Sequence, residues 1–435
     1  MARSRSSWQS RLRRDVESVH RVVITGMGTI TAIGNSPAAL FESALVARSG
    51  VRLAPELAVS AAIPLVASAA FDAAAVVPRQ RGAPLDRATA MALAAVRQAI
   101  GDSGIRFDGQ SPDTGIYWGT GMGAANTLED SYRGIFQDNN WRLRPTSIIT
   151  AMNNAPAAVI SLEYGITGPS ITYSVACASS SVAIGEAMRA IRHGAIDCAI
   201  VGGSEAMLTR GMLSAWSALR ALATPDPIDA ACSCKPFAAD RCGFVIGEGA
   251  AALVLESFER AQERGAGVYA ELAGFGLSSD AAHIADPSAE GQTRAIAAAL
   301  QDASVRPEDV GYINAHGTAT VLGDRIETES IRRIFGDVSP RVAVSSTKGV
   351  HGHVMGATGA IEFTIAVLAL HHGSVPPTAH LRRTDPSLDL DLVPNAARHG
   401  VALEAVVSNS FAFGGSNAVL VARRVAEHQR RSAVA

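Results

Sequence analysis

The feature that most constrains this chain is an alternation of short apolar runs with longer segments of helical periodicity. The strand-like runs are Gly115 to Gly119, Ser170 to Val175, Cys198 to Gly202, Val310 to Asn314 and Val342 to Ser345. The helix-like segments are Arg87 to Ile100, Asn154 to Tyr164, Ala178 to His193, Thr293 to Ala303, Asp324 to Phe335 and Ala357 to His371. Strands joined through helices usually run parallel in one sheet. The sequence therefore predicts an α/β protein.

This alternation occurs twice, which predicts two α/β halves, 21–265 and 266–424. A chain of 435 residues is long enough for such a duplication. Two apolar runs between Ala405 and Arg423 flank a glycine-containing loop, as in a hairpin. Near the start, Arg21 to Thr25 predicts a buried strand that ends in a turn at Gly26 to Gly28. The Ala- and Pro-rich residues 51–84 predict a surface excursion.

The charge balance and the cysteine content exclude several classes of protein. The 38 basic and 40 acidic side chains nearly cancel, so neither nucleic acid nor an anionic membrane is an expected partner. No apolar run reaches the roughly 20 residues of a membrane span. Five cysteines, an odd number, without a signal-peptide pattern favour a reducing, cytoplasmic location. The arginine-rich residues 1–20 predict a flexible arm, and 425–435 a tail.

Two further motifs are too incomplete to carry a function. Gly26 and Gly28 follow a strand, but Thr31 stands where a dinucleotide-binding fingerprint has its third glycine. Cys232 and Cys234 form a Cys-x-Cys pair, yet the spacing supplies no second pair for a structural zinc ion. We therefore expect neither a dinucleotide nor a metal.

Cys177 follows a strand-like run and precedes a helix that opens with small residues, Ala178 to Ser181. A free cysteine is commonly an inert core residue. At a helix N-terminus, however, unpaired amides and the helix dipole stabilise a thiolate and supply donors for an oxyanion. The sequence therefore predicts a nucleophilic Cys177 with a lowered thiol pKa.

Two histidines also follow predicted strands. His316 lies in Asn-Ala-His-Gly-Thr, and His353 ends the segment that begins at Lys348. Lysine and glutamate side chains are rarely buried unless they are paired. We therefore expect Lys348 and Glu362 to pair and to order His353. His351 and His353 could also suggest a metal pair, but in an extended segment they point apart, which favours catalysis.

The last motif, Phe411 to Gly415, combines two phenylalanines with two glycines. Glycine frees the backbone to swing or to direct an N–H at a reacting oxygen, and a phenylalanine beside it can close a pocket. The same motif could equally be an aromatic plug of the core.

In this order along the chain, the four motifs resemble those of the β-ketoacyl-acyl-carrier-protein synthases of the elongating type II branch, the ketosynthases. The resemblance rests on Val-Ala-Cys-Ala-Ser-Ser, Asn-Ala-His-Gly-Thr and Lys-x-x-x-Gly-His, and it spans residues 21–424. It implies a thiolase-like fold, with two similar halves in a five-layered α-β-α-β-α arrangement, and a homodimer.

The resemblance also implies the role of each site residue. Cys177 is expected to take an acyl chain as a thioester. His316 and His353 are expected to bind the malonyl thioester and promote its decarboxylation, with Lys348 and Glu362 ordering the second histidine. A further set follows: Phe413 as a gate whose N–H joins the oxyanion hole, Met122, Thr318, Thr320, Phe411 and Gly414 as substrate contacts, and Arg220, Arg142 and Arg144 as carrier-protein contacts.

The implied reaction is the decarboxylative condensation of an acyl group with malonyl-acyl-carrier protein, in fatty-acid or polyketide-type elongation. It needs no metal or other cofactor, because the phosphopantetheine arm arrives on the carrier protein. Two alternatives share the fold: a non-catalytic chain-length partner subunit, and a starter-unit synthase that uses coenzyme A thioesters. Cys177 argues against the first and the His316–His353 pair against the second. Ala412 departs from the glycine usual in the family, which predicts a stiffer gate.

Overall fold

A computed structural model describes residues 19–58, 63–78, 85–107 and 109–425, so the predicted arm and tail lie almost wholly outside it. Its ten-stranded sheet has the order β11-β10-β14-β15-β9-β1-β8-β6-β4-β5. The strands are β1 Val22–Ile30, β4 Thr114–Gly119, β5 Ser170–Tyr173, β6 Cys198–Glu205, β8 Gly249–Ser257, β9 Ala270–Ser279, β10 Val310–Asn314, β11 Ala343–Ser345, β14 Ala405–Ala412 and β15 Ser416–Arg423.

The helices of this body form three layers. They are α3 Arg87–Ser103, α6 Ala155–Tyr164, α7 Ser179–Arg192, α10 Ala289–Ala303, α11 Val321–Phe335 and α13 Thr358–His372. Helices α3 and α6 pack on β1, β4 and β8, whereas α10 packs on β9 and β15 and carries α11. Helices α7 and α13 contact strands of both halves of the sheet. The three helical layers alternate with the two halves of the sheet. Together they form the predicted five-layered thiolase-like arrangement.

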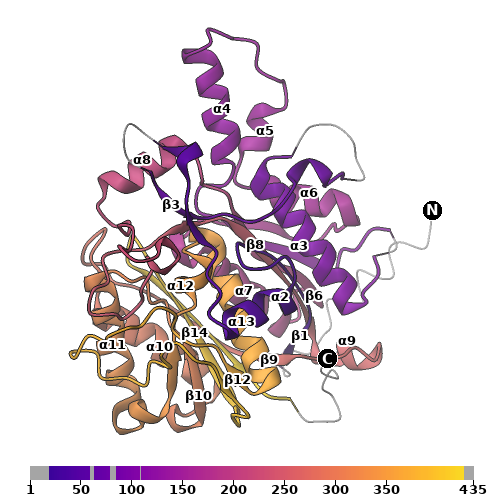
Figure 1. Ribbon diagram of the computed structural model, residues 1–435. Coiled ribbons are helices and arrows are strands. Elements are labelled where there is room, and N and C mark those ends of the chain that lie inside the picture. Colours follow the sequence, from indigo (N-terminus) through magenta and orange to yellow (C-terminus); the bar gives the residue numbers. More distant parts are fainter. Residues whose placement is uncertain (1–18, 59–62, 79–84, 108, 426–435) are drawn as a thin grey trace, which may run out of the picture.

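The remaining elements are short or peripheral. They are α2 Pro37–Leu45, α4 Ala125–Phe136, α5 Ser147–Ala151, α8 Arg210–Ala218, α9 Phe258–Glu263, α12 Lys348–His351, β2 Val51–Leu53, β3 Leu65–Ala67, β7 Ile246–Gly247, β12 Ser374–Val375 and β13 Arg398–His399. Helices α4 and α5 project from the body at the top of Figure 1.

The two halves of the sheet repeat one topology. In the first, β1 pairs antiparallel with β8, β8 antiparallel with β6, and β6 parallel with β4, which pairs parallel with β5. In the second, β9, β15, β14, β10 and β11 pair in the same order and the same directions. Helix α7, which follows β5, therefore corresponds to α13, which follows β11. The motifs that contain Cys177 and His353 lie at the starts of these two helices.

Helix α13 shows why the middle layer forms from this sequence. Every residue from Thr358 to Leu370 is buried, and a helix that is apolar all round is stable only when it is covered on every side. Its one acidic residue, Glu362, is buried too and is paired with a lysine, as described below. The helix is therefore a packed element between two sheet layers rather than a membrane span.

Two expectations about the N-terminal part need correction. Gly26 and Gly28 do not form a turn, because β1 continues through both to Ile30. They are glycines because α3 packs closely on them: a Cβ at Gly28 would lie 2.0 Å from the carbonyl oxygen of Ala95. Among the described residues of 51–84, β2 and β3 form a small sheet with β7, so this segment is not only an irregular excursion.

Candidate active site

Cys177 lies in the 3₁₀ turn Ala176–Ala178, which leads directly into α7. The turn enters on a positive φ of 43° at Ala176, and the Cys177 side chain is only 2% exposed. The backbone N–H groups of Phe413, from the β14–β15 loop, and of Cys177 itself act on the thiol and lower its pKa. The thiol forms part of the wall of a cavity of 310 Å³, so a substrate can reach it.

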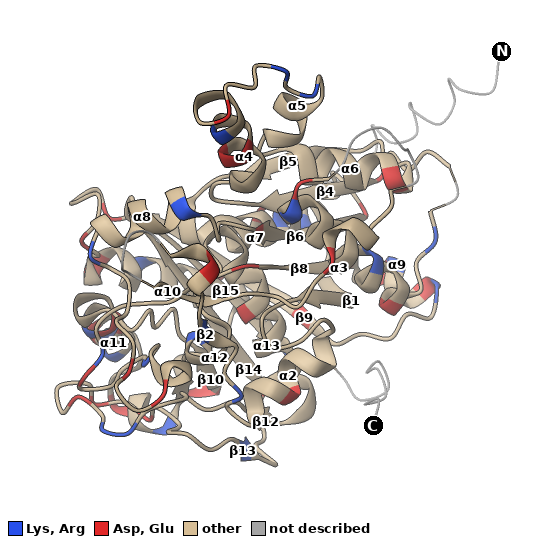
Figure 2. Cartoon of the chain, turned by 45° about the horizontal axis from the view of Figure 1, so that its top comes forward, with Lys and Arg blue, Asp and Glu red and all other residues tan. Residues whose placement is uncertain are grey.

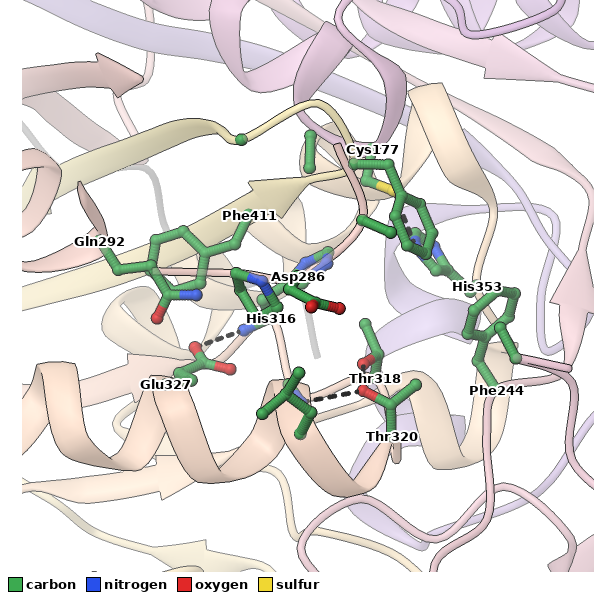
Figure 3. A pocket seen from close by; sticks show the side chains of 18 of the residues that line it. Cys177, Phe244, Asp286, Gln292, His316, Thr318, Thr320, Glu327, His353 and Phe411 are labelled. Carbon is green, nitrogen blue, oxygen red and sulfur yellow. Dashed lines mark hydrogen bonds between the residues drawn. The ribbon is translucent and has the colours of Figure 1, made fainter. Parts of the chain in front are cut away.

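His316 and His353 meet at this sulfur from two other loops (Figure 3). His316 follows β10, and His353 lies between α12 and the 3₁₀ turn Met355–Ala357 that leads into α13. Nε2 of His353 is 3.2 Å from Sγ of Cys177, and the two imidazole rings lie edge to face with centroids 5.4 Å apart. The structure therefore brings all three predicted residues into one site.

Hydrogen bonds to the far side of each ring set its tautomer. Nδ1 of His353 accepts the backbone N–H of Met355 at 3.2 Å and contacts Oγ1 of Thr358 at 3.0 Å. Nδ1 of His316 lies 3.4 Å from the ammonium of Lys348. Burial lowers the pKa of both histidines well below the usual value. Each ring is thus neutral and carries its proton on Nε2.

The structure contradicts the expected partner of Lys348 and Glu362. Nζ of Lys348 is 2.6 Å from Oε1 of Glu362, and it also donates to the carbonyl oxygen of His316. The pair therefore orders His316, whereas Thr358 and the Met355 amide order His353. Position along the chain suggested the wrong histidine, because the loop that contains Lys348 folds back against the end of β10. Burial raises the pKa of Glu362 to about 7 despite the lysine.

The expectation of a lowered thiol pKa is also wrong. Burial raises the pKa of Cys177 to about 11, although the amides of Phe413 and Cys177 and the charge of Lys348 all act to lower it. Removal of water from around the sulfur disfavours the thiolate more than these groups stabilise it. The free enzyme therefore holds a neutral thiol.

Only some of the predicted substrate and carrier contacts line this cavity. Its lining includes Thr318, Thr320, Phe411, Phe413 and Arg220, all of which the sequence indicated. Oγ1 of Thr318 and Oγ1 of Thr320 are 2.9 Å apart, and the ring of Phe411 lies edge to face with His316.

The other predicted contacts lie elsewhere. The N–H of Gly414 donates to the carbonyl oxygen of Ile284, so it does not face the reacting atoms. Met122 is 48% exposed and lines a separate groove between α4 and α8. Arg142 and Arg144 are exposed on the loop that joins α4 and α5. Within the single chain described, Gly414, Met122, Arg142 and Arg144 do not line the cavity around Cys177.

Three important contacts were not identified from the sequence. Glu327 of α11 accepts the N–H groups of His316 and Gly317, at 2.8 and 2.7 Å. Thr358 contacts His353, and the ring of Phe244 lies edge to face with that histidine at 5.3 Å. Glu327 could have been noticed as an acidic residue on the face of α11 that packs inward, but no local pattern indicates Phe244.

Cys177, His316 and His353 also offer three potential metal ligands within 4.8 Å of one another. However, the Nδ1 bonds leave a proton on each Nε2, so both rings present donors rather than lone pairs to the sulfur. The arrangement suits an oxyanion better than a cation. Among the described residues, no such group includes Cys232, Cys234 or Cys242. None of the described helices has both the length and the apolarity required to cross a bilayer.

A cysteine at a helix start that faces two N–H-donating imidazoles, within a duplicated five-layered α/β body, defines a thiolase-like condensing enzyme. Comparisons with known proteins identify the family. Residues 19–261 match the profile of the beta-ketoacyl synthase N-terminal domain, and residues 269–382 match that of the C-terminal domain. The chain belongs to the beta-ketoacyl synthase family.

Individual relatives agree over nearly the whole chain. Nodulation protein E of Rhizobium leguminosarum bv. trifolii is 40% identical, with 93% of this chain and 99% of that protein covered. The 3-oxoacyl-[acyl-carrier-protein] synthase 2 of Staphylococcus aureus is 38% identical, with 93% and 98% covered. A beta-ketoacyl synthase structure from Burkholderia phymatum has a TM-score of 0.87 at 34% identity, covering 94% and 100%. A type II polyketide ketosynthase in complex with its acyl-carrier protein has a TM-score of 0.84 at 28% identity, covering 94% and 100%.

Proposed function

We propose that this protein condenses an acyl group, held as a thioester on Cys177, with malonyl-acyl-carrier protein to give a β-ketoacyl-acyl-carrier protein in fatty-acid or polyketide-type elongation. The observation that carries the proposal is the grouping of Cys177, His316 and His353, whose Sγ and one nitrogen from each ring lie within 4.8 Å of one another, with the Nε2 of His353 3.2 Å from the sulfur. Imidazole N–H donors stabilise the negative charge that develops on a thioester oxygen during decarboxylation.

In the first step, the Cys177 sulfur attacks the acyl thioester. The carbon–sulfur bond to the carrier breaks, and the cysteine proton leaves with the phosphopantetheine thiol. We expect the N–H groups of Phe413 and Cys177, both of which lower the pKa of the thiol, to bind the oxyanion of the tetrahedral intermediate. Because the free thiol is neutral, the proton and the acyl group are exchanged together, and no thiolate need accumulate.

In the second step, the malonyl thioester oxygen accepts hydrogen bonds from Nε2 of His316 and of His353. The bond to the carboxylate breaks, carbon dioxide leaves, and the resulting enolate carbon attacks the acyl thioester on Cys177. The cysteine leaves as a thiolate and takes up one proton. The buried cavity protects the enolate from protonation by water. No metal or redox cofactor has a role in this scheme.

The carrier protein is proposed to deliver its arm at the mouth of the cavity, where Arg220 is exposed. Figure 2 also shows basic residues on the loop that joins α4 and α5, where Arg142 and Arg144 lie. A carrier complex of a related ketosynthase supports this partner. Arginine side chains attract an acidic carrier and fix its orientation more than they add affinity.

We further propose a homodimer in the cytoplasm. Strand β5 is an exposed sheet edge, and the nearby α4–α5 projection exposes large apolar side chains: Tyr132, Phe136, Trp141, Ile148 and Ile149 are 57 to 76% exposed. Unpaired edges and contiguous apolar surface favour association with another chain. Five free cysteines suit a reducing compartment.

Intact-mass spectrometry after incubation with a panel of acyl-acyl-carrier proteins tests the proposal. The expected result is a single acyl adduct on Cys177, followed by its loss when malonyl-acyl-carrier protein is added. Acylation only by coenzyme A thioesters would indicate a starter-unit synthase instead. No adduct from any donor would indicate a non-catalytic subunit.

A further inference from the structure

Glu205, the last residue of β6, is a buried carboxylate whose hydrogen bonds come from backbone amides. Oε2 accepts the N–H groups of Gly121 at 2.6 Å and Gly356 at 2.9 Å. Oε1 accepts those of Met122 and Gly123 at 3.0 and 3.1 Å. A third contact to Oε1 comes from a side chain, the hydroxyl of Thr120, at 3.3 Å. One carboxylate therefore joins two loops that are far apart in sequence.

The first loop, 120–123, touches the segment that carries the nucleophile. Ser174 lies three residues before Cys177, and its Oγ donates to the carbonyl oxygen of Gly121 at 3.1 Å. The two loops are also packed tightly together, because a Cβ at Gly356 would lie 2.3 Å from the backbone nitrogen of Gly121. A shift of one loop must therefore move the other.

The second loop, 353–356, carries His353. The amide that sets the tautomer of this histidine belongs to Met355, and the amide that Glu205 binds is the next one along the chain. Met355 has a φ of +42°, a conformation that side-chain-bearing residues adopt only with support from their surroundings. The hydrogen bond from the N–H of Gly356 to Glu205 holds the peptide that directly follows Met355 and so supports this conformation.

The duplication of the fold explains why such a group is needed here. Gly356 is the second residue of the 3₁₀ turn that leads into α13. Cys177 holds the same position, second, in the 3₁₀ turn that leads into α7. The amide of Cys177 acts on its own sulfur and lowers the pKa of the thiol. The equivalent amide of Gly356 would have no substrate to bind, and the Glu205 carboxylate occupies that position.

We propose that Glu205 is a positioning residue that fixes the tautomer and place of His353 through the Met355–Gly356 peptide. The proposal rests on the function proposed above, in which His353 donates Nε2–H to the malonyl thioester. Glu205 itself does not touch the reacting atoms; it acts through the loop.

The test compares Glu205→Gln with Glu256→Gln. Glutamine keeps the shape but turns one acceptor into a donor that opposes the amides. Glu256 is an equally buried glutamate on β8, bound by Arg260 and Arg264 rather than by active-site loops. We expect E205Q to lower kcat for release of carbon dioxide from malonyl-acyl-carrier protein by about tenfold or more. The KM should change by less than about threefold, and the rate of Cys177 acylation should fall by clearly less than the rate of decarboxylation. E256Q should leave all of these rates near those of the wild type.

Histidine-labelled NMR supplies a readout that a purely structural role would not change. In the wild type, the His353 signal should report a proton on Nε2, and in E205Q a mixture of tautomers. If E205Q does not fold, Glu205→Asp, which keeps the charge but reaches only one of the two loops, is measured in the same way.

Two results would overturn the inference. One is a wild-type rate of decarboxylation and an unchanged tautomer in the folded variant. The other is an equal fall of acylation and decarboxylation in E205Q. Both leave the proposed function intact, because that function fails only if the wild-type enzyme itself does not condense.

Discussion

The sulfur of Cys177 lies 3.2 Å from Nε2 of His353, yet burial raises the pKa of the thiol to about 11. The imidazole donates a hydrogen bond to the sulfur and does not act as its base in the free enzyme. The position of Cys177 at the start of α7 therefore does not lower the pKa of the thiol, because burial outweighs the nearby amides.

This relationship predicts the pH dependence of Cys177 alkylation. A raised pKa means that the thiolate fraction grows through the whole neutral range, so the rate with iodoacetamide should rise about tenfold per pH unit between pH 7 and 9. The measurement is a peptide-resolved mass-spectrometric rate, with Cys177→Ser used to subtract reaction at the exposed Cys242. A plateau by pH 8 would contradict the assignment of a neutral thiol.

The two halves of the reaction should separate in variants of Cys177 and His353. Cys177→Ala removes the nucleophile, so acyl transfer is lost, but malonyl decarboxylation continues because both N–H donors remain. His353→Ala should lower decarboxylation roughly 100- to 1,000-fold, the size found when one oxyanion donor is removed, while Cys177 still accepts an acyl group. Adduct mass and released carbon dioxide measure the two steps. Unchanged condensation in either variant would refute the scheme.

Lys348→Met should disturb His316 rather than His353. It removes the ammonium beside Nδ1 of His316 and leaves Glu362 buried without its partner. Breaking a buried ion pair costs about 3 to 5 kcal/mol, so the free energy of unfolding in urea should fall by that amount. Decarboxylation should fall as well.

The control for Lys348→Met is the double variant Lys348→Met/Glu362→Gln. It should recover part of the stability, because no uncompensated charge remains, without recovering decarboxylation. If histidine NMR showed His353 as the ring perturbed by Lys348→Met, the observed pairing would be wrong.

The sequence predicted which side chains meet in the site better than it predicted their partners. Cys177, His316 and His353 each follow a strand, and the ends of parallel strands meet at one edge of a sheet. A short sequence pattern is enough to place a residue at the end of a strand, so this rule can be applied to the sequence alone. Which side chain supports which ring depends on how α12 folds against β10, and no local pattern shows that Lys348 lies beside His316.

Two other errors arose from environment rather than from pattern. Gly26 and Gly28 were interpreted as a turn, but the close approach of α3 requires them in a strand. The thiol pKa of Cys177 was expected to fall because a helix start favours a thiolate. The structure shows a side chain that is almost fully buried, and desolvation dominates. Burial of a single atom depends on the whole fold and is not contained in a short motif.

The loop after β14 offers the last prediction. Ala412 pairs with Ser416 as part of the hairpin, so its Cβ fits an ordinary strand conformation. The positive φ values lie at Gly414 and Gly415, at 86° and 76°. The structure therefore places the flexible point of the loop after Phe413 rather than before it.

Gly414→Ala should consequently be more harmful than Ala412→Gly. A Cβ at Gly414 meets no atom within 4 Å, so the change tests backbone conformation alone and should cost about 1 to 2 kcal/mol of stability. It should also slow acylation of Cys177 by long chains, which require Phe413 to move. Ala412→Gly should cost about 0.5 to 1 kcal/mol and should speed that acylation. Urea unfolding and stopped-flow acylation measure both effects, and equal rates in the two variants would show that the loop does not limit substrate entry.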